Sequence, residues 1–193
     1  MTASEICLAV AALAVATQLG GCAAAVGAGA VAGTVAVHDR RSTGTFVDDE
    51  LIEWRVLKSL SEERELWQQS HINVTSYNNM VLLSGEVPTE PMKRTAESAA
   101  RTHPQVRGVF NELVIAAPSS LLSRSSDTVI TGKVKTTLLG QKEALATRVK
   151  VVTEGGTVFL LGLITRAEAE DITEVTRRVG GVQRVVKLFE YLD

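Results

Sequence analysis

The sequence has 193 residues, of which 20 are basic, 22 are acidic and 4% are aromatic. A chain of this length forms one medium-sized domain or two small ones. The near-balanced charge argues against nucleic acid as a general partner, and the few aromatic residues argue against a surface that stacks single-stranded bases. Both cysteines, Cys7 and Cys22, lie near the N-terminus. A disulfide framework and a cysteine-based metal site are therefore excluded from the rest of the chain.

The N-terminal region contains a long uncharged segment, because no charged residue occurs from Leu8 to Val37. A transmembrane helix needs about 20 mostly apolar residues, and this segment is long enough. Five glycines interrupt it, however. The apolar stretch from Leu8 to Leu19 has the length expected of the core of a cleavable signal peptide. We therefore favour a signal peptide, with a transmembrane anchor as the alternative.

The end of this stretch, Leu19-Gly20-Gly21-Cys22, resembles the lipobox of bacterial lipoproteins. The resemblance implies that residues 1–21 are removed, that the Cys22 thiol carries a diacylglycerol and that the freed amine is acylated. Each buried methylene contributes about 0.8 kcal/mol, so several acyl chains make a stable anchor. The first seven residues depart from the usual pattern, since they contain Glu5 and no Lys or Arg. Ala23 after the cysteine favours sorting to the outer membrane.

Residues 22–45 are predicted to form a lipidated, flexible tether. Ala23 to Val37 consists only of Ala, Gly, Val and one Thr, a composition that cannot build a hydrophobic core. Ordered structure is expected to begin near Phe46.

The rest of the chain contains an internal repeat, which is the first feature to look for in a new sequence. Three blocks of similar residues occur twice in the same order, at offsets of 78, 77 and 76 residues. The blocks are Asp49-x-x-Ile52-x-x-x-Val56-x-x-x-Leu60 with Asp127-x-x-Ile130-x-x-x-Val134-x-x-x-Leu138, Val81 to Gly85 with Val158 to Gly162, and Val106-x-x-Val109 with Val182-x-x-Val185. We predict a first module over residues 46–116, and a linker with a second module over residues 117–193.

Each module is predicted to have the order αββαβ. An Asp or Ser caps a first helix, whose apolar residues recur every four positions and form one buried stripe. Two strands follow, joined by turns at Asn78-Asn79 and Glu154-Gly155-Gly156 that tolerate positive φ. Thr89 caps the second helix of the first module, and Thr165 to Glu168 form a capping box in the second. A last strand covers Val106 to Ile115 or Val182 to Tyr191. The predicted fold class is α+β, with a three-stranded mixed sheet and two helices on one face of it.

The repeated helix stripe, the strand ending in glycine and the closing Val-x-x-Val strand resemble the BON-domain family. Together with the lipobox, they resemble outer-membrane lipoproteins that carry two such modules. The resemblance implies a lipid-anchored protein that faces the periplasm, supports envelope integrity and is enriched at the division septum. It also implies that the first helix of the second module, here roughly Asp127 to Leu139, binds anionic phospholipid such as phosphatidylglycerol or cardiolipin. A relative has an aromatic residue where this chain has Val129, so one interfacial anchor is lost.

The charge distribution supports the second module as the membrane-facing one. Residues 46–116 contain 7 basic and 11 acidic side chains, whereas residues 117–193 contain 11 basic and 9 acidic ones. Each surface cation near an anionic bilayer contributes about 1 kcal/mol. The candidate lipid-binding residues are those of the first helix that fall off its core stripe or add positive charge: Val129, Lys133, Lys135, Thr136 and Leu139. The alternative is an ordinary solvated face or a contact between the modules.

The other candidate site residues have structural explanations or lack the partners that a functional site needs. His38, His71 and His103 have no cysteine partners and no metal-binding spacing, so neither a catalytic site nor a metal site is predicted. Interaction with a helix dipole explains the acidic run Asp48-Asp49-Glu50. The serines from Ser123 to Ser126 are interpreted as linker and cap.

Trp54 and Trp67 are expected to pack in the core or between modules, with a peptide-binding surface as the alternative. No enzyme activity and no cofactor are predicted. The competing function is a periplasmic scaffold that docks envelope proteins, such as the outer-membrane barrel-assembly machinery.

Overall fold

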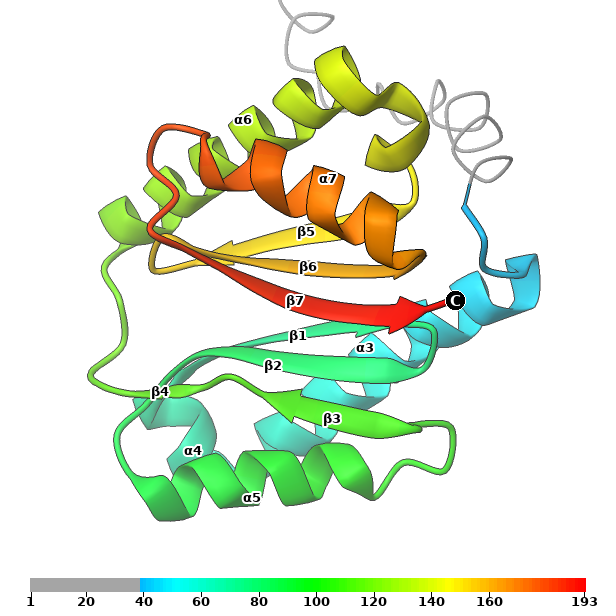
Figure 1. Cartoon of the computed structure of the whole chain (residues 1–193). Helices are drawn as coiled ribbons and strands as arrows, with labels where there is room; N and C mark the ends of the chain where they lie inside the picture. Colours follow the sequence, from blue (N-terminus) through cyan, green and yellow to red (C-terminus); the bar gives the residue numbers. More distant parts are fainter. Residues whose placement is uncertain (1–38) are drawn as a thin grey trace, which may run out of the picture. The chain divides into compact units, whose positions relative to one another are not determined.

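A computed structural model describes residues 39–193, which contain two modules of similar architecture (Figure 1). The predicted signal peptide, Cys22 and most of the predicted tether lie outside the described residues. The first module contains α3 (Thr43–Glu62), α4 (Arg64–Gln69), β1 (His71–Tyr77), β2 (Met80–Val87), α5 (Glu90–Arg101), β3 (Gly108–Asn111) and β4 (Val114–Ile115). The second contains α6 (Leu121–Ala146), β5 (Val149–Glu154), β6 (Thr157–Ile164), α7 (Arg166–Arg177) and β7 (Arg184–Tyr191).

Each module has a mixed sheet, as predicted. In the first, β1 and β2 are antiparallel and β3 runs parallel to β2 after the crossover through α5. In the second, β5 and β6 are antiparallel and β7 runs parallel to β6. The hairpin turns have the expected positive φ angles, 52° and 63° at Asn78 and Asn79 and 53° and 71° at Gly155 and Gly156. These angles match the two-residue turn whose twist suits an antiparallel pair.

The last strand of the first module is not continuous, which corrects the predicted strand from Val106 to Ile115. It is split into β3 and β4, and both segments pair with β2. The break occurs at Glu112 and Leu113, where the Leu113 side chain is buried in the core of the module. Because the strand is interrupted here, the Leu113 side chain packs into the core, and pairing with β2 resumes at Val114.

The predicted helix stripes form the core of each module. Ile52, Val56 and Leu60 on α3 are buried against the sheet, and Ile130, Val134 and Leu138 occupy the same positions on α6. Both helices of a module cover the same face of its sheet (Figure 1). The opposite faces of the two sheets pack on each other through an apolar cluster of Tyr77, Leu82, Phe159, Leu161 and Leu188. The order of layers is therefore helices, sheet, sheet, helices.

The first helix of each module begins earlier than the sequence predicted. Helix α3 begins at Thr43, three residues before Phe46, because the Ser42 side chain accepts a hydrogen bond from the Thr45 amide. Helix α6 begins at Leu121, because Ser120 caps the Ser123 amide in the same way. Ser123 to Ser126 are thus part of a helix rather than a linker, and the predicted tether is shorter at its C-terminal end. A serine at the N-cap satisfies amides that the helix itself leaves free.

The residues before α3 contact both modules. Arg41 forms an ion pair with Asp49 of the first module, with 2.8 Å between Nη1 and Oδ2. Arg40 forms an ion pair with Glu168 on α7, with 2.8 Å between Nη1 and Oε2, and donates a hydrogen bond to the Leu163 carbonyl. Arg148 pairs with the same glutamate at 2.5 Å. Glu168 also completes the predicted capping box with Thr165. Burial by itself raises the pKa of Glu168, but the hydrogen bonds from Arg40 and the Thr165 amide, with the charges of Arg40 and Arg148, outweigh it and lower the pKa to about 2.

This pKa predicts a loss of stability in acid. A carboxyl group with a depressed folded-state pKa stabilises the fold above its unfolded-state pKa of 4.5 and loses that contribution as the pH falls toward 2. The contribution at neutral pH is at most about 3 kcal/mol. Denaturant unfolding of the parent and of Glu168→Gln between pH 6 and pH 2 should therefore differ most at pH 6 and converge at pH 2. Glu170→Gln, an exposed change on the same helix, should behave as the parent, and a constant difference for Glu168→Gln across this range would contradict the assignment.

Candidate functional site

The five residues predicted to bind lipid all lie on the solvent-exposed surface of α6. Val129 is 55% exposed and Leu139 is 50% exposed. With about 3.6 residues per turn, Val129, Thr136 and Leu139 point away from the buried stripe, and Lys133 and Lys135 lie on the two sides of this outer face. The structure thus brings apolar and basic residues together on one helix surface that is not covered by the second module's core.

Sequence reasoning missed two residues of this surface, Leu121 and Leu122. They form the first turn of α6 and are 80% and 78% exposed. They were overlooked because the helix was expected to start at Asp127, beyond the serine run. Ser120 followed by helix-forming leucines was the available signal for the earlier start. We call Leu121, Leu122, Val129, Lys133, Lys135, Thr136 and Leu139 the outer face of α6.

The charge on α6 is available to a ligand. Neither Lys133 nor Lys135 forms an ion pair with any side chain that the structure describes, whereas Lys142 is paired with Asp171 at 2.8 Å. Asp127 is buried and its carboxylate faces the β5–β6 turn. Lys133 also borders a groove of about 480 Å³ between α6 and α7, together with Thr137, Gln141 and Arg178. Arg178 is paired with Glu174, which lines the same groove, so the ammonium groups of Lys133 and Lys135 are the ones that can lie next to an anion while the leucines contact apolar chains.

The corresponding helix of the first module has an apolar outer surface. Val47, Leu51 and Trp54 recur on the face of α3 opposite its core, and they are 53%, 40% and 62% exposed. Trp67 on α4 is 43% exposed. The expectation that both tryptophans pack in a core or between modules is therefore wrong. Helix α3 has five acidic residues and two basic ones, but Asp49 is buried and paired with Arg41, and Glu53 is paired with Lys150.

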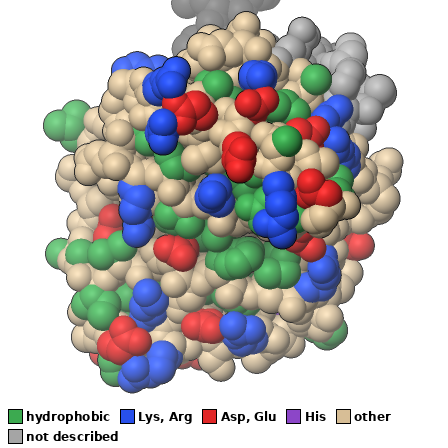
Figure 2. Space-filling view, viewed as in Figure 1, with side chains coloured by type: hydrophobic (Ala, Val, Ile, Leu, Met, Phe, Trp, Pro, Cys, Tyr) green, Lys and Arg blue, Asp and Glu red, His purple; other side chains and the backbone are tan. Residues whose placement is uncertain are grey.

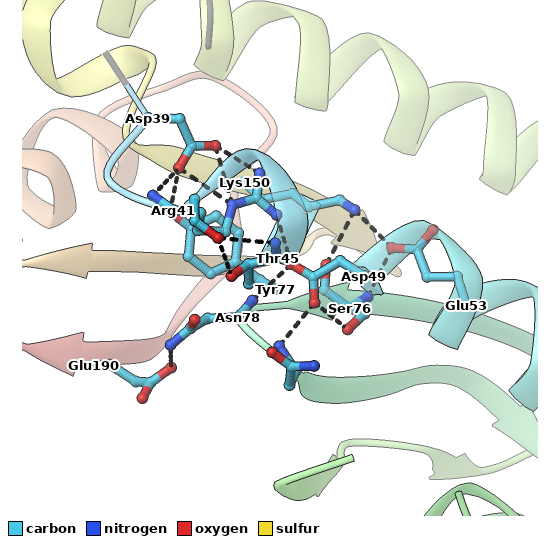
Figure 3. A network of polar contacts seen from close by, with 12 residues as sticks. Asp39, Arg41, Thr45, Asp49, Glu53, Ser76, Tyr77, Asn78, Lys150 and Glu190 are labelled. Atoms are coloured by element: carbon cyan, nitrogen blue, oxygen red, sulfur yellow. Dashed lines mark hydrogen bonds and ion pairs between the residues drawn. The ribbon is translucent and has the colours of Figure 1, made fainter. Parts of the chain in front are cut away.

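Asp49 is the centre of a polar network at the edge of the first module (Figure 3). Its carboxylate accepts hydrogen bonds from the Asn78 and Asn79 amides at 2.8 Å each, from Ser76 Oγ at 2.6 Å and from Arg41 Nη1 at 2.8 Å. Asp127 accepts bonds from the Gly155 and Gly156 amides at 3.0 and 2.9 Å. The sequence suggested that the repeated aspartate caps the first helix or interacts with its dipole. The structure shows neither role. The aspartate holds the hairpin turn against the first helix.

Polar contacts also join the two modules along the edges of the packed sheets. They surround the apolar cluster between the sheets, and Figure 2 shows hydrophobic side chains across the middle of the view. Lys150 Nζ lies 2.6 Å from Glu53 Oε1, and Arg107 Nη2 lies 2.9 Å from Glu190 Oε2. Tyr77 donates a hydrogen bond to the Arg148 carbonyl at 3.1 Å, and burial raises the pKa of its hydroxyl to about 12. These contacts fix one module on the other and leave the outer faces of α3 and α6 pointing in opposite directions.

A histidine and a glutamate from different modules lie close together where β1 and β2 meet the end of β5. His71 Nε2 lies 3.6 Å from Glu154 Oε1. Burial lowers the pKa of His71, assisted by the positive charge of Arg124. Burial also raises the pKa of Glu154, and the nearby charges of Glu86 and Asp127 add to that increase.

Comparison with known proteins places this fold in a family. The family model for the BON domain matches residues 48–117 and 126–193. The chain belongs to the BON-domain family. The two matched ranges correspond to the two structural modules, and they include the repeated aspartates at their N-terminal ends.

Curated relatives extend this match to most of the chain. The chain is 40% identical over 176 residues to the outer membrane lipoprotein DolP of Haemophilus influenzae, covering 91% of each chain. It is 40% identical over 155 residues to a protein named 21 kDa hemolysin of Actinobacillus pleuropneumoniae, covering 80% of each. It is 28% identical over 145 residues to the osmotically-inducible protein Y of Escherichia coli, covering 74% of this chain and 72% of the relative.

The predicted anchor residue, Cys22, is not among the residues that the structure describes. Across residues 39–193, none of the helices has the length and apolar character needed to span a bilayer.

Proposed function

We propose that this BON protein is a non-catalytic lipoprotein of the outer membrane, anchored through Cys22, that binds anionic phospholipid with its second module. The observation that carries the proposal is the outer face of α6, where four exposed apolar side chains lie beside two lysines without ion-pair partners among the described residues. The name of the relative from Haemophilus influenzae supports the anchor and the membrane.

The physical basis is the combination of two weak attractions. Apolar side chains on a helix that lies in the bilayer surface gain free energy by leaving water, and adjacent lysines gain about 1 kcal/mol each near anionic headgroups. A protein held only by acyl chains diffuses over the whole membrane. A second contact with anionic lipid therefore concentrates it where such lipid is enriched, and we include enrichment at the division septum and support of envelope integrity in the proposal.

Flotation of residues 38–193 with liposomes tests the lipid contact without the anchor. This segment is one compact unit and contains both module cores. We expect the bound fraction to rise with phosphatidylglycerol or cardiolipin content and to fall with added salt, because salt screens exposed charges. Lys133→Glu and Leu139→Glu should each weaken binding at least tenfold. The first reverses a charge and so changes the attraction by about two unit charges, and the second removes apolar contact area and adds one negative charge.

Matched controls lie on the equivalent helix of the first module. Lys58→Glu and Leu51→Glu make the same kinds of change on exposed positions of α3. They should leave flotation unchanged and should keep the same circular dichroism spectrum as the parent. Absence of binding at low salt, or equal losses from the α3 and α6 variants, would contradict the proposal.

A second candidate function is supported by the outer face of α3. An exposed Trp54 beside Leu51 and Val47 has the aromatic and aliphatic character of a protein-binding surface. The first module carries 11 acidic and 7 basic side chains, and this excess of negative charge disfavours an anionic bilayer. In this alternative, the protein is a periplasmic scaffold for envelope proteins such as the outer-membrane barrel-assembly machinery. Loss of partner capture in Trp54→Ala, with Lys133→Glu and Leu139→Glu silent, would favour the scaffold over lipid binding.

A further inference from the structure

Three potential metal ligands from both modules meet at one end of the packed sheets. His71 on β1 and Glu86 on β2 are direct partners in the antiparallel ladder, and Glu154 is the last residue of β5. One donor atom from each lies within 4.8 Å of the other two. All three side chains are partly buried. These residues are far apart in the sequence, so their spacing gave no indication of a shared site.

The cluster differs from the other polar contacts between the modules because no Lys or Arg of the described residues forms an ion pair with its carboxylates, although Arg124 lines the same pocket as His71 and Glu154. Glu53 is paired with Lys150 and Glu190 with Arg107. Glu86 and Glu154 have no Lys or Arg within ion-pair distance among the residues that the structure describes. Two carboxylates therefore share a partly buried space with one imidazole, and burying such a pair is unfavourable unless a cation offsets the charge.

We propose that His71, Glu86 and Glu154 bind a zinc ion that bridges the two modules. Zinc accepts imidazole nitrogen at about 2.0–2.1 Å and carboxylate oxygen at about 2.0–2.2 Å, which places the donors of a tetrahedral site roughly 3.4 Å apart. His71 Nε2 and Glu154 Oε1 are already 3.6 Å apart. Glu86 completes the set by a rotation of its flexible side chain. Water fills the fourth position.

Neighbouring groups orient the ligands and leave donor atoms free. The side-chain nitrogen of Asn73, Nδ2, donates a hydrogen bond to Glu154 Oε2 at 2.6 Å. The other carboxylate oxygen, Oε1, is therefore the one that faces His71. The Ser119 amide donates to Glu86 Oε2 at 3.2 Å and leaves its other oxygen available. The Asn73 amide nitrogen also lies 3.2 Å from His71 Nε2, and zinc takes over that lone pair while the amide keeps its bond to Glu154. Such outer hydrogen bonds hold metal ligands in position.

Titration of residues 38–193 tests the site, because this compact unit contains all three ligands and no cysteine that would compete for zinc. Calorimetry with zinc chloride and visible absorption with cobalt chloride should both give one ion per chain. His71→Ala and Glu154→Gln should each weaken zinc binding more than tenfold. Zinc should raise the melting temperature of the parent and should not shift that of His71→Ala.

The matched control is His103→Ala. His103 forms a hydrogen bond with Ser59 and belongs to no carboxylate cluster among the described residues, so its removal should leave zinc affinity unchanged. Circular dichroism of each variant without metal establishes that it is folded. No saturable zinc binding in the parent, equal affinity in folded His71→Ala, or binding of calcium in place of zinc would overturn the proposal.

Discussion

Replacing Asp49 with alanine is expected to lower the free energy of unfolding by about 3–5 kcal/mol, because it removes one partner of a buried and hydrogen-bonded ion pair. Asp49 is 1% exposed. It accepts four hydrogen bonds, from two turn amides, a serine hydroxyl and Arg41. Alanine leaves these donors without an acceptor in a place that water does not reach. Denaturant unfolding followed by circular dichroism measures the loss.

Glu50→Ala is the matched control, since it removes a carboxylate from the neighbouring, exposed position of α3. Its effect should stay within about 0.5 kcal/mol, as is usual for surface substitutions. Asp127→Ala should fall between the two, because Asp127 holds two turn amides and has no arginine partner among the described residues. A loss below about 1 kcal/mol for Asp49→Ala would show that the network does not stabilise the hairpin.

Replacing Leu82 with alanine should cost about 2–5 kcal/mol, the range measured when a leucine is truncated in a packed core. Leu82 is fully buried, and it faces the other module rather than the helices of its own. The cavity therefore forms between the two sheets. Thermal unfolding should show a lower midpoint and, because the contact between the modules is weakened, a broader transition than in the parent.

Leu121→Ala makes the same change at the most exposed leucine of the outer face of α6. It should leave stability within about 0.5 kcal/mol of the parent. It should still reduce liposome flotation, because it removes apolar area from the proposed contact. Equal stability losses from Leu82→Ala and Leu121→Ala would contradict the packing of the two sheets on each other.

The parts of the fold that follow local rules could be predicted from the sequence. The helix stripes at Ile52, Val56 and Leu60 and at their counterparts depend only on a period of about 3.6 residues. The hairpin turns depend on residues that adopt positive φ, and the capping box depends on Thr165 and Glu168 being three residues apart. Each of these patterns is complete within one short segment, so no knowledge of distant residues was needed.

The apolar pattern of the sequence also contains an indication that one sheet packs on the other. Strands β2 and β6 contain unbroken apolar runs, Val81 to Leu83 and Val158 to Leu161. An unbroken run is typical of a strand that is covered on both faces, whereas a strand with one solvated face alternates. Leu82, Phe159 and Leu161 are the residues of these runs that face the other module.

The sequence by itself determined the two αββαβ modules, their core stripes and the greater positive charge of the second one. Only the tertiary structure decided the rest: that Asp49 and Asp127 hold hairpin turns, that Trp54 faces solvent, that Leu121 and Leu122 extend the outer face of α6, and that His71 meets Glu154. The physical reason is that these features depend on contacts between segments that are distant in the chain. Such contacts form only when the hydrophobic faces of helices and sheets dock, and no period within a single segment encodes them.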